Sequence, residues 1–117
     1  MHRSLIATLV PTASGTEPSE ALVAGFVATV RVLKRMIFLI VQDRTGRLQV
    51  TIDRAPAGEP PRVVEQCALD LTIGSAVRVR GNIVANAAVK VGGIELLASS
   101  LELVSRAGNR RAWRLMG

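Results

Sequence analysis

The segment from Met36 to Asp53 holds the side chains whose types and spacing are best suited to chemistry. Phe38 is one of only two phenylalanines in a chain that is 3% aromatic and has no tyrosine. Gln49 lies beyond the sequence Asp-Arg-Thr-Gly at residues 43–46, which is typical of a turn. An aromatic ring can stack on a nucleic-acid base, and a side-chain amide offers a base edge a donor and an acceptor together. The pair therefore indicates a surface that stacks on a base and hydrogen bonds to it.

The same segment predicts a β-hairpin, which places Phe38 and Gln49 on neighbouring strands. After the turn the sequence alternates with a period of two, so that one face is apolar and the other polar: Leu48, Val50 and Ile52 against Arg47, Gln49, Thr51 and Asp53. We expect the apolar face to pack in a core and the polar face, Thr51 included, to be exposed. The pattern of the first strand leaves open whether Phe38 fills the core or lies on the surface.

One strand is expected before this hairpin and a helix after it. Residues 21–32 predict a long first strand, in which Gly25 indicates a bulge or a bend. A tight basic turn at residues 33–35 then leads into the hairpin. After a loop rich in proline, a short helix of roughly two to three turns is expected, which ends before Gly74.

Two more strands are expected after the helix. In residues 76–86, valines alternate with Arg78 and Arg80, which places the two arginines on the outer face. Residues 94–104 form the last predicted strand. Their apolar positions change parity at Ser99–Ser100, and this change predicts a β-bulge.

The order of three strands, a helix and two strands predicts an all-β fold, namely a five-stranded OB-fold Greek-key barrel with one short helix between strands 3 and 4. Residues 21–105 would form this OB-fold nucleic-acid-binding domain. Residues 1–20 would form an N-terminal segment and loop, in which residues 3–10 fit either a helical turn or an edge strand. Residues 106–117 would form a basic tail with Trp113, which serves either as a linker or as an arm that contacts RNA.

Composition narrows the class of ligand. The chain has 117 residues, which suits one domain, and no apolar run approaches the roughly 20 residues that span a membrane. The single Cys67 and single His2 exclude an internal disulfide and the usual zinc site, so we expect a cytoplasmic protein without metal or cofactor. The net charge of +6, carried by thirteen arginines and two lysines, favours a polyanionic partner.

Six cations are candidate phosphate contacts, provided that the fold brings them to one face: Lys34, Arg35, Arg44, Arg47, Arg78 and Arg80. Scattered surface charge is the alternative interpretation for each of them.

Four stretches, in order along the chain, carry a resemblance to a known family. They read ALVAGFVATVR, MIFLIVQDRTGRLQVTID, VRVRGNIVAN and GGIELLASSLELVSRA. Together they resemble the N-terminal anticodon-binding OB domain of class II aminoacyl-tRNA synthetases. The subgroup is the aspartyl, asparaginyl and lysyl one, and the aspartyl and asparaginyl branches look closest. The resemblance extends over residues 21–107.

The resemblance implies roles for three residues. In that family a strand-two phenylalanine stacks on an anticodon base, a strand-three glutamine hydrogen bonds to the central uridine, and a strand-one arginine assists. By position these are Phe38, Gln49 and Arg31. The chain departs from the family at the turn that follows, where Asp-Leu-Gly is replaced by Val32-Leu33-Lys34, and at Phe26, where tryptophan is usual.

The resemblance also implies what these 117 residues do not do. They hold no ATP-binding motif of a class II synthetase, so we expect no enzymatic activity from them. The first hypothesis is therefore a non-catalytic domain that binds RNA, namely the anticodon loop of a tRNA. The alternatives are a protein-interaction module, with a synthetase or another protein as partner, and a general binder of single-stranded nucleic acid.

Overall fold

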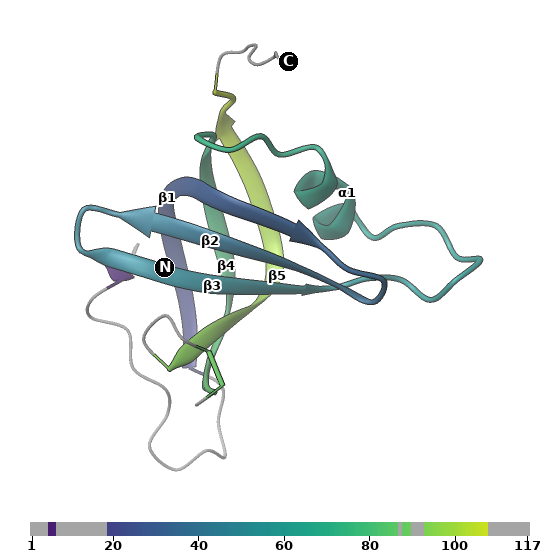
Figure 1. The fold of residues 1–117 in the computed structure, drawn as a ribbon, viewed down its shortest axis with the longest axis horizontal. Helices are drawn as coiled ribbons and strands as arrows, with labels where there is room; N and C mark the ends of the chain where they lie inside the picture. Colours follow the sequence, from purple (N-terminus) through teal and green to yellow (C-terminus); the bar gives the residue numbers. More distant parts are fainter. Residues whose placement is uncertain (1–4, 7–18, 87, 90–92, 108–117) are drawn as a thin grey trace.

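Five strands wind into a closed barrel with one short helix at its side (Figure 1). The computed structural model describes residues 5–6, 19–86, 88–89 and 93–107. Its elements are β1 (Ser19–Val32), β2 (Met36–Asp43), β3 (Gly46–Asp53), α1 (Val63–Leu69), β4 (Ala76–Ala85) and β5 (Ile94–Ser105). The strand order around the barrel is β1-β2-β3-β5-β4, and every pair is antiparallel except β3 with β5. The predicted five-stranded OB-fold, with its helix between strands 3 and 4, is confirmed.

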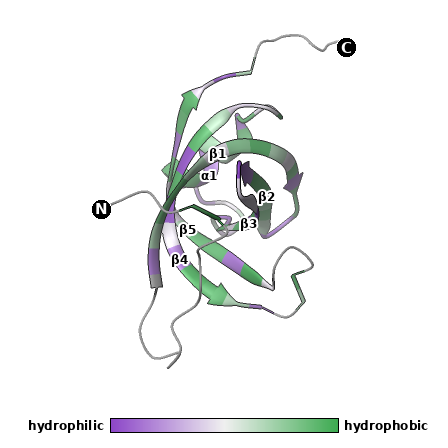
Figure 2. Ribbon diagram, turned by 90° about the vertical axis from the view of Figure 1, so that its left-hand side faces the viewer, coloured by the Kyte–Doolittle hydropathy of each residue, from purple (hydrophilic) through white to green (hydrophobic). Residues whose placement is uncertain are grey.

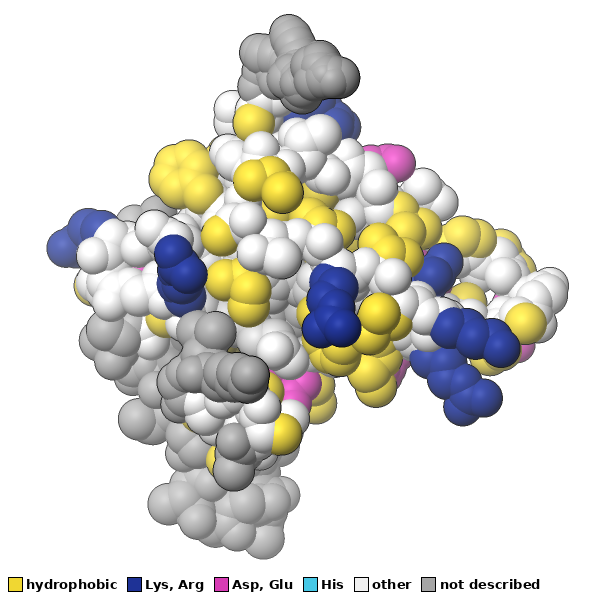
Figure 3. Space-filling view, in the orientation of Figure 1, with side chains coloured by type: hydrophobic (Ala, Val, Ile, Leu, Met, Phe, Trp, Pro, Cys, Tyr) yellow, Lys and Arg dark blue, Asp and Glu magenta, His cyan; other side chains and the backbone are white. Residues whose placement is uncertain are grey.

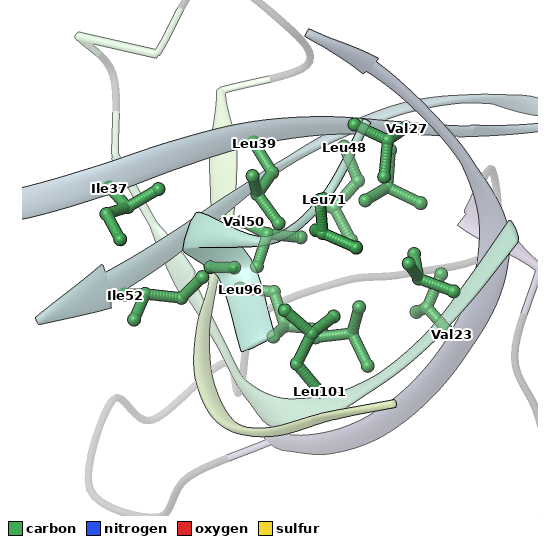
Figure 4. Close-up of a cluster of buried hydrophobic side chains, with 14 of the residues drawn as sticks. Val23, Val27, Ile37, Leu39, Leu48, Val50, Ile52, Leu71, Leu96 and Leu101 are labelled. Atoms are coloured by element: carbon green, nitrogen blue, oxygen red, sulfur yellow. The ribbon is translucent and has the colours of Figure 1, made fainter. Parts of the chain in front are cut away.

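Alternation along the strands places one apolar face inside the barrel. In the hairpin, the fully buried side chains are Ile37, Leu39, Val41, Leu48, Val50 and Ile52. They converge with side chains of β1, β4 and β5 in the barrel interior, as Figure 4 shows. The burial patterns of β2 and β3 follow this period of two, and Figure 2 shows hydrophobic and hydrophilic stretches along the same strands. The apolar face of the hairpin is thus core, and its polar face forms the outer surface.

The first strand bends so that it pairs with two different neighbours. Its first half runs along β4 and its second half along β2, and Phe26 has a partner in both. At the bend, a Cβ on Gly25 would lie 2.5 Å from the carbonyl oxygen of Gln42, so only glycine lets the backbones approach this closely. The register shift itself falls between Val27 and Thr29. Gly25 therefore marks the bend, and the bulge follows it.

The predicted bulge in the last strand is confirmed. Arg80 of β4 pairs with Ser100 and Gly81 pairs with Ala98, so Ser99 is the extra residue. The bulge lies beside Gly81, where a Cβ would come within 2.1 Å of the carbonyl oxygen of Leu97. The close approach of β4 and β5 at this point depends on the absence of that side chain.

The N-terminal segment contributes a small anchor to the turn of the hairpin. Ile6 is buried, and its N–H donates to Asp43 over 2.8 Å. Partial burial opposes ionisation of Asp43, but donation from Thr45, Ile6 and Gly46 outweighs it and lowers the pKa of the carboxyl. The remainder of the predicted segment, residues 1–4 and 7–18, and residues 108–117 of the predicted tail lie outside the described residues.

A buried carboxylate braces the connection between β3 and α1. Glu65, only 3% exposed, accepts hydrogen bonds from the N–H of Ala55 over 2.8 Å and from Nε of Arg54 over 3.0 Å. Arg54 also donates from Nη1 to the carbonyl oxygen of Leu33 over 2.8 Å. Glu65 therefore ties this loop to the β1–β2 turn. The Ala55 N–H and the Arg54 side chain lower the pKa of the Glu65 carboxyl.

Replacing this carboxyl should make the protein less stable and less sensitive to acid. Because the folded-state pKa is lowered, the stabilisation is fully present above the ordinary glutamate pKa of about 4.3 and is lost as the pH falls through the folded value. We expect Glu65→Gln to lower the melting temperature by several degrees at pH 7 and to flatten its decline in acid. Thermal melts from pH 7 down to below the ordinary glutamate pKa would measure both effects.

Glu59 provides the matched control for this prediction. It lies exposed in the same loop, so Glu59→Gln removes the same charge without the hydrogen bonds. Its melting temperature should stay close to that of the unmodified chain. Parallel pH curves for Glu65→Gln and the unmodified chain would contradict the proposed brace.

Candidate nucleic-acid interface

A row of paired residues crosses the outer face of the barrel. Arg31 of β1 pairs with Phe38 of β2, Phe38 pairs with Thr51 of β3, and Thr51 pairs with Leu97 of β5. Partners in neighbouring strands project to the same side of a sheet, so these four side chains stand next to one another. The alternatives left open for Phe38 are thereby resolved: its ring lies on the outer face, half-buried.

A second row runs parallel to the first and contains Gln49. It joins Ile40 of β2, Gln49 of β3 and Glu95 of β5. Members of both rows, though neither Arg31 nor Ile40, line a groove of about 530 Å³. Strands β2, β3 and β5 and the β4–β5 connection line it, with Met36, Phe38, Gln49, Thr51, Asp53, Asn86, Ala88, Val89, Glu95 and Leu97. The groove therefore combines an aromatic ring and exposed aliphatic surface with amides and carboxylates.

Hydrogen bonds hold the polar side chains of the groove in place. The hydroxyl of Thr51 donates to Oε1 of Glu95 over 2.6 Å, and Asn86 donates from Nδ2 to the other oxygen of that carboxylate. Because its proton is committed to Glu95, the Thr51 hydroxyl accepts from Nε2 of Gln49, at 3.4 Å. Among the described residues, no donor reaches the Gln49 carbonyl oxygen. Gln49 is thus oriented from one side and leaves an acceptor for a ligand.

The burial of Thr51 corrects one expectation and reveals two missed residues. Thr51 lies on the polar face of the hairpin, as predicted, but it is only 5% exposed. It is buried because the parallel pairing of β3 with β5 places Glu95 and Leu97 beside it. The sequence contained one signal for Glu95, an acid between two apolar residues of a predicted strand. Asn86 carried no comparable signal.

Three of the expected cations lie near the groove, and a fourth lies further along the hairpin. Arg31 is exposed beside Phe38, and Lys34 and Arg35 are exposed on the turn that follows. Arg47 is exposed towards the tip of the hairpin, where its Nε donates to Gln42 over 3.2 Å. Figure 3 shows the basic side chains of this face as separate groups, several of them at the end where the β1–β2 turn projects.

Arg78 and Arg80 do not join this group. Both are exposed on β4, which lies between β1 and β5 around the barrel, and neither lines the groove. Arg78 pairs with Glu102 at 3.3 Å and borders a separate hollow that contains Phe26. Arg44 borders that hollow as well. The condition that all the cations share one face is therefore not met.

The described residues, 5–6, 19–86, 88–89 and 93–107, contain neither a candidate metal site nor a membrane-spanning helix. Within these ranges, no three His, Cys, Asp or Glu side chains gather closely enough to hold a metal ion. Nor does any helix in these ranges reach the length and apolar character that crossing a membrane requires.

Comparison with known families agrees with the geometry. A model of the tRNA anti-codon family, described as an OB-fold nucleic acid binding domain, matches residues 21–104, from β1 to the end of β5. The chain belongs to this family. The resemblance to the anticodon-binding domains of synthetases is confirmed at the level of this OB domain.

The relatives of this OB domain are much longer proteins. It is 36% identical over 91 residues to an aspartate–tRNA(Asp/Asn) ligase of Methanoculleus marisnigri, which aligns 78% of this chain with 20% of the ligase. A ligase of the same name from Aeropyrum pernix is 31% identical over 100 residues, with 86% of this chain and 22% of the ligase aligned. The chain thus spans about a fifth of the length of the curated relatives it matches.

A solved structure shows the same fold. The asparaginyl-tRNA synthetase from Pyrococcus horikoshii, complexed with asparaginyl-adenylate, superposes with a TM-score of 0.75 at 24% identity. The superposition covers 92% of this chain and 23% of the synthetase. The likeness is one of fold.

Proposed function

We propose that this OB domain binds the anticodon loop of a tRNA and catalyses no reaction itself. The observation that carries the proposal is that Phe38 and Gln49 line one groove of a domain of this family, and that Arg31 is the cross-strand partner of Phe38. The longer relatives are ligases that act on tRNA, and this chain matches only about a fifth of their length. A cytoplasmic location, where tRNA is found, is part of the proposal.

Each of the three side chains has a distinct task in this proposal. The ring of Phe38 stacks on an unpaired base, a contact that contributes roughly 1–3 kcal/mol in single-stranded ligands. The carbonyl oxygen of Gln49 accepts from N3–H of a uridine at the centre of the loop, in an orientation set by Thr51. Arg31, exposed beside Phe38, attracts the phosphates that flank the stacked base.

Anticodon variants test the part assigned to Gln49. Loss of one hydrogen bond to a base edge should cost about 0.5–1.5 kcal/mol, which corresponds to roughly a twofold to twelvefold change in affinity. We expect Gln49→Ala to weaken binding of transcripts with a central U by this factor and to remove the preference over transcripts with a central C. Fluorescence titration of both transcripts would measure the ratio.

Gln42 offers a matched control for this substitution. It is an exposed glutamine on the outer face of the same hairpin, near the turn and bonded to Arg47. Gln42→Ala should leave the ratio between the transcripts unchanged. If the unmodified domain binds every anticodon and an oligo-dT strand equally well, it is a general binder of single strands and the anticodon proposal is wrong.

A further inference from the structure

The two connections at one end of the barrel form a basic projection next to the groove. The β1–β2 turn carries Lys34 and Arg35, and the β3–α1 connection lies beside it in Figure 1. Both cations are exposed, and in the described part of the chain neither has an acidic partner within ion-pair distance. Between the two connections lies a hollow of about 710 Å³, which Lys34 and Arg35 line from one side. The two charges are therefore available to a ligand.

The turn that carries these cations is held in a defined position. The N–H of Leu33 donates to the carbonyl oxygen of Met36 over 2.8 Å. The N–H of Arg54 donates to the carbonyl oxygen of Arg35 over 3.0 Å. The Arg54 side chain links the turn to the buried Glu65. A backbone fixed in this way loses little conformational freedom when it binds, so the turn is organised in advance for contact.

The basic turn continues directly from the groove. Met36, which lines the groove, directly follows Arg35 in sequence. Arg31, near the end of β1, lies three positions before Lys34. At about 3.3 Å per residue, Lys34 lies within roughly 10 Å of the Arg31 backbone. Lys34 and Arg35 are therefore close enough to attract the sugar–phosphate chain of an RNA whose bases occupy the groove.

The chemistry of the turn selects phosphates over bases. It offers an ammonium and a guanidinium, while the exposed apolar neighbours, Val32 and Leu33, are aliphatic and give no ring for stacking. Cations of this kind contact the backbone without reading sequence. In a hairpin RNA, the phosphates just beyond the unpaired loop belong to the base-paired stem.

We infer that Lys34 and Arg35 form a second contact site that binds the phosphates of the stem adjoining the RNA loop held in the groove. The inference rests on the proposed function, because the groove must hold the loop for the stem to reach the turn. It assigns the turn a ligand class, duplex RNA backbone, that differs from the single-stranded ligand of the groove.

Two RNA probes separate this site from the groove: a hairpin with stem and loop, and a linear RNA with the loop sequence alone. For the Lys34→Ala/Arg35→Ala double variant we expect roughly tenfold weaker binding of the hairpin at about 0.1 M salt. The slope of log affinity against log salt should fall by about 1.8, which corresponds to two phosphate contacts on a duplex. Affinity for the linear RNA should stay within about twofold of the unmodified value.

The control for the Lys34→Ala/Arg35→Ala variant is a second double variant that removes the same net charge elsewhere on the barrel. Arg78→Ala/Arg80→Ala removes two cations of β4 that do not line the groove, and it should leave hairpin binding within about twofold. Equal losses from both double variants, equal losses for both RNAs, or no loss for the hairpin would each overturn the stem site while the groove proposal stands. If the unmodified domain binds neither RNA, both proposals fail.

Discussion

Phe38→Ala should weaken binding of an anticodon stem-loop by roughly fivefold to a hundredfold while the barrel stays folded. Removing the ring removes a stacking contact of roughly 1–3 kcal/mol. The core keeps its buried side chains, because Ile37 and Leu39 on either side of Phe38 point inward and Phe38 does not. Fluorescence titration would measure affinity, and a thermal melt of the same sample would show that the fold persists.

The other phenylalanine provides a control for this substitution. Phe26 is 60% exposed and borders a separate hollow with Arg44 and Arg78. Phe26→Ala should leave RNA affinity within about twofold. Phe38→Leu keeps an apolar side chain without a ring and should lose most of the affinity that Phe38→Ala loses, whereas Phe38→Trp should retain binding. If the Phe26 and Phe38 variants bind equally well, the ring of Phe38 does not stack on RNA.

The second large effect concerns stability. Gly81→Ala should destabilise the barrel by about 3 kcal/mol, because overpacking at a close backbone contact forces strands apart. The new Cβ would meet the Leu97 carbonyl oxygen at 2.1 Å and a Leu96 methyl group at 2.7 Å. For a domain of this size the melting temperature would fall by roughly 10–20 °C. Differential scanning calorimetry would measure the change.

A second glycine on the same barrel serves as the comparison. At Gly46, the nearest atom to an added Cβ is a methyl group of Ile6 at 3.4 Å, which is ordinary contact. Gly46→Ala should change stability by no more than about 1 kcal/mol. If Gly81→Ala and Gly46→Ala have the same melting temperature, β4 and β5 have room to separate. The close approach of these two strands at Gly81 would then not limit the side chain there.

Local patterns in the sequence were sufficient to predict the strands of the barrel. Period-two alternation identified the hairpin and its buried face, and the change of parity at Ser99–Ser100 located the bulge of β5. Such features depend on residues near one another in sequence, so they can be derived from one chain. Gly25 shows the limit. Its presence in a predicted strand indicates a bend or a bulge, and which of the two it forms depends on the strands that β1 meets on each side.

The groove could be predicted only in part for the same reason. Phe38 and Gln49 lie in one hairpin, and their placement on neighbouring strands followed from the turn between them. Glu95 and Asn86 reach the groove through the parallel pairing of β3 with β5, which no local pattern reveals. Arg78 and Arg80 illustrate the converse. Both side chains lie on the outer surface, as predicted. That surface runs all the way around a closed barrel, so two exposed cations can still lie on different sides of it.

The seam between β3 and β5 also determines when the groove comes into existence. It consists of three residue pairs, two of which contain Gln49 and Thr51, and the Thr51–Glu95 hydrogen bond joins residues 44 positions apart. Contacts so distant in sequence carry a large entropic cost of loop closure, and they cannot form before both partners have been synthesised. During synthesis, the hairpin leaves the ribosome with its aromatic ring and amide already present. It has no groove to offer RNA until the last strand has been made and docked.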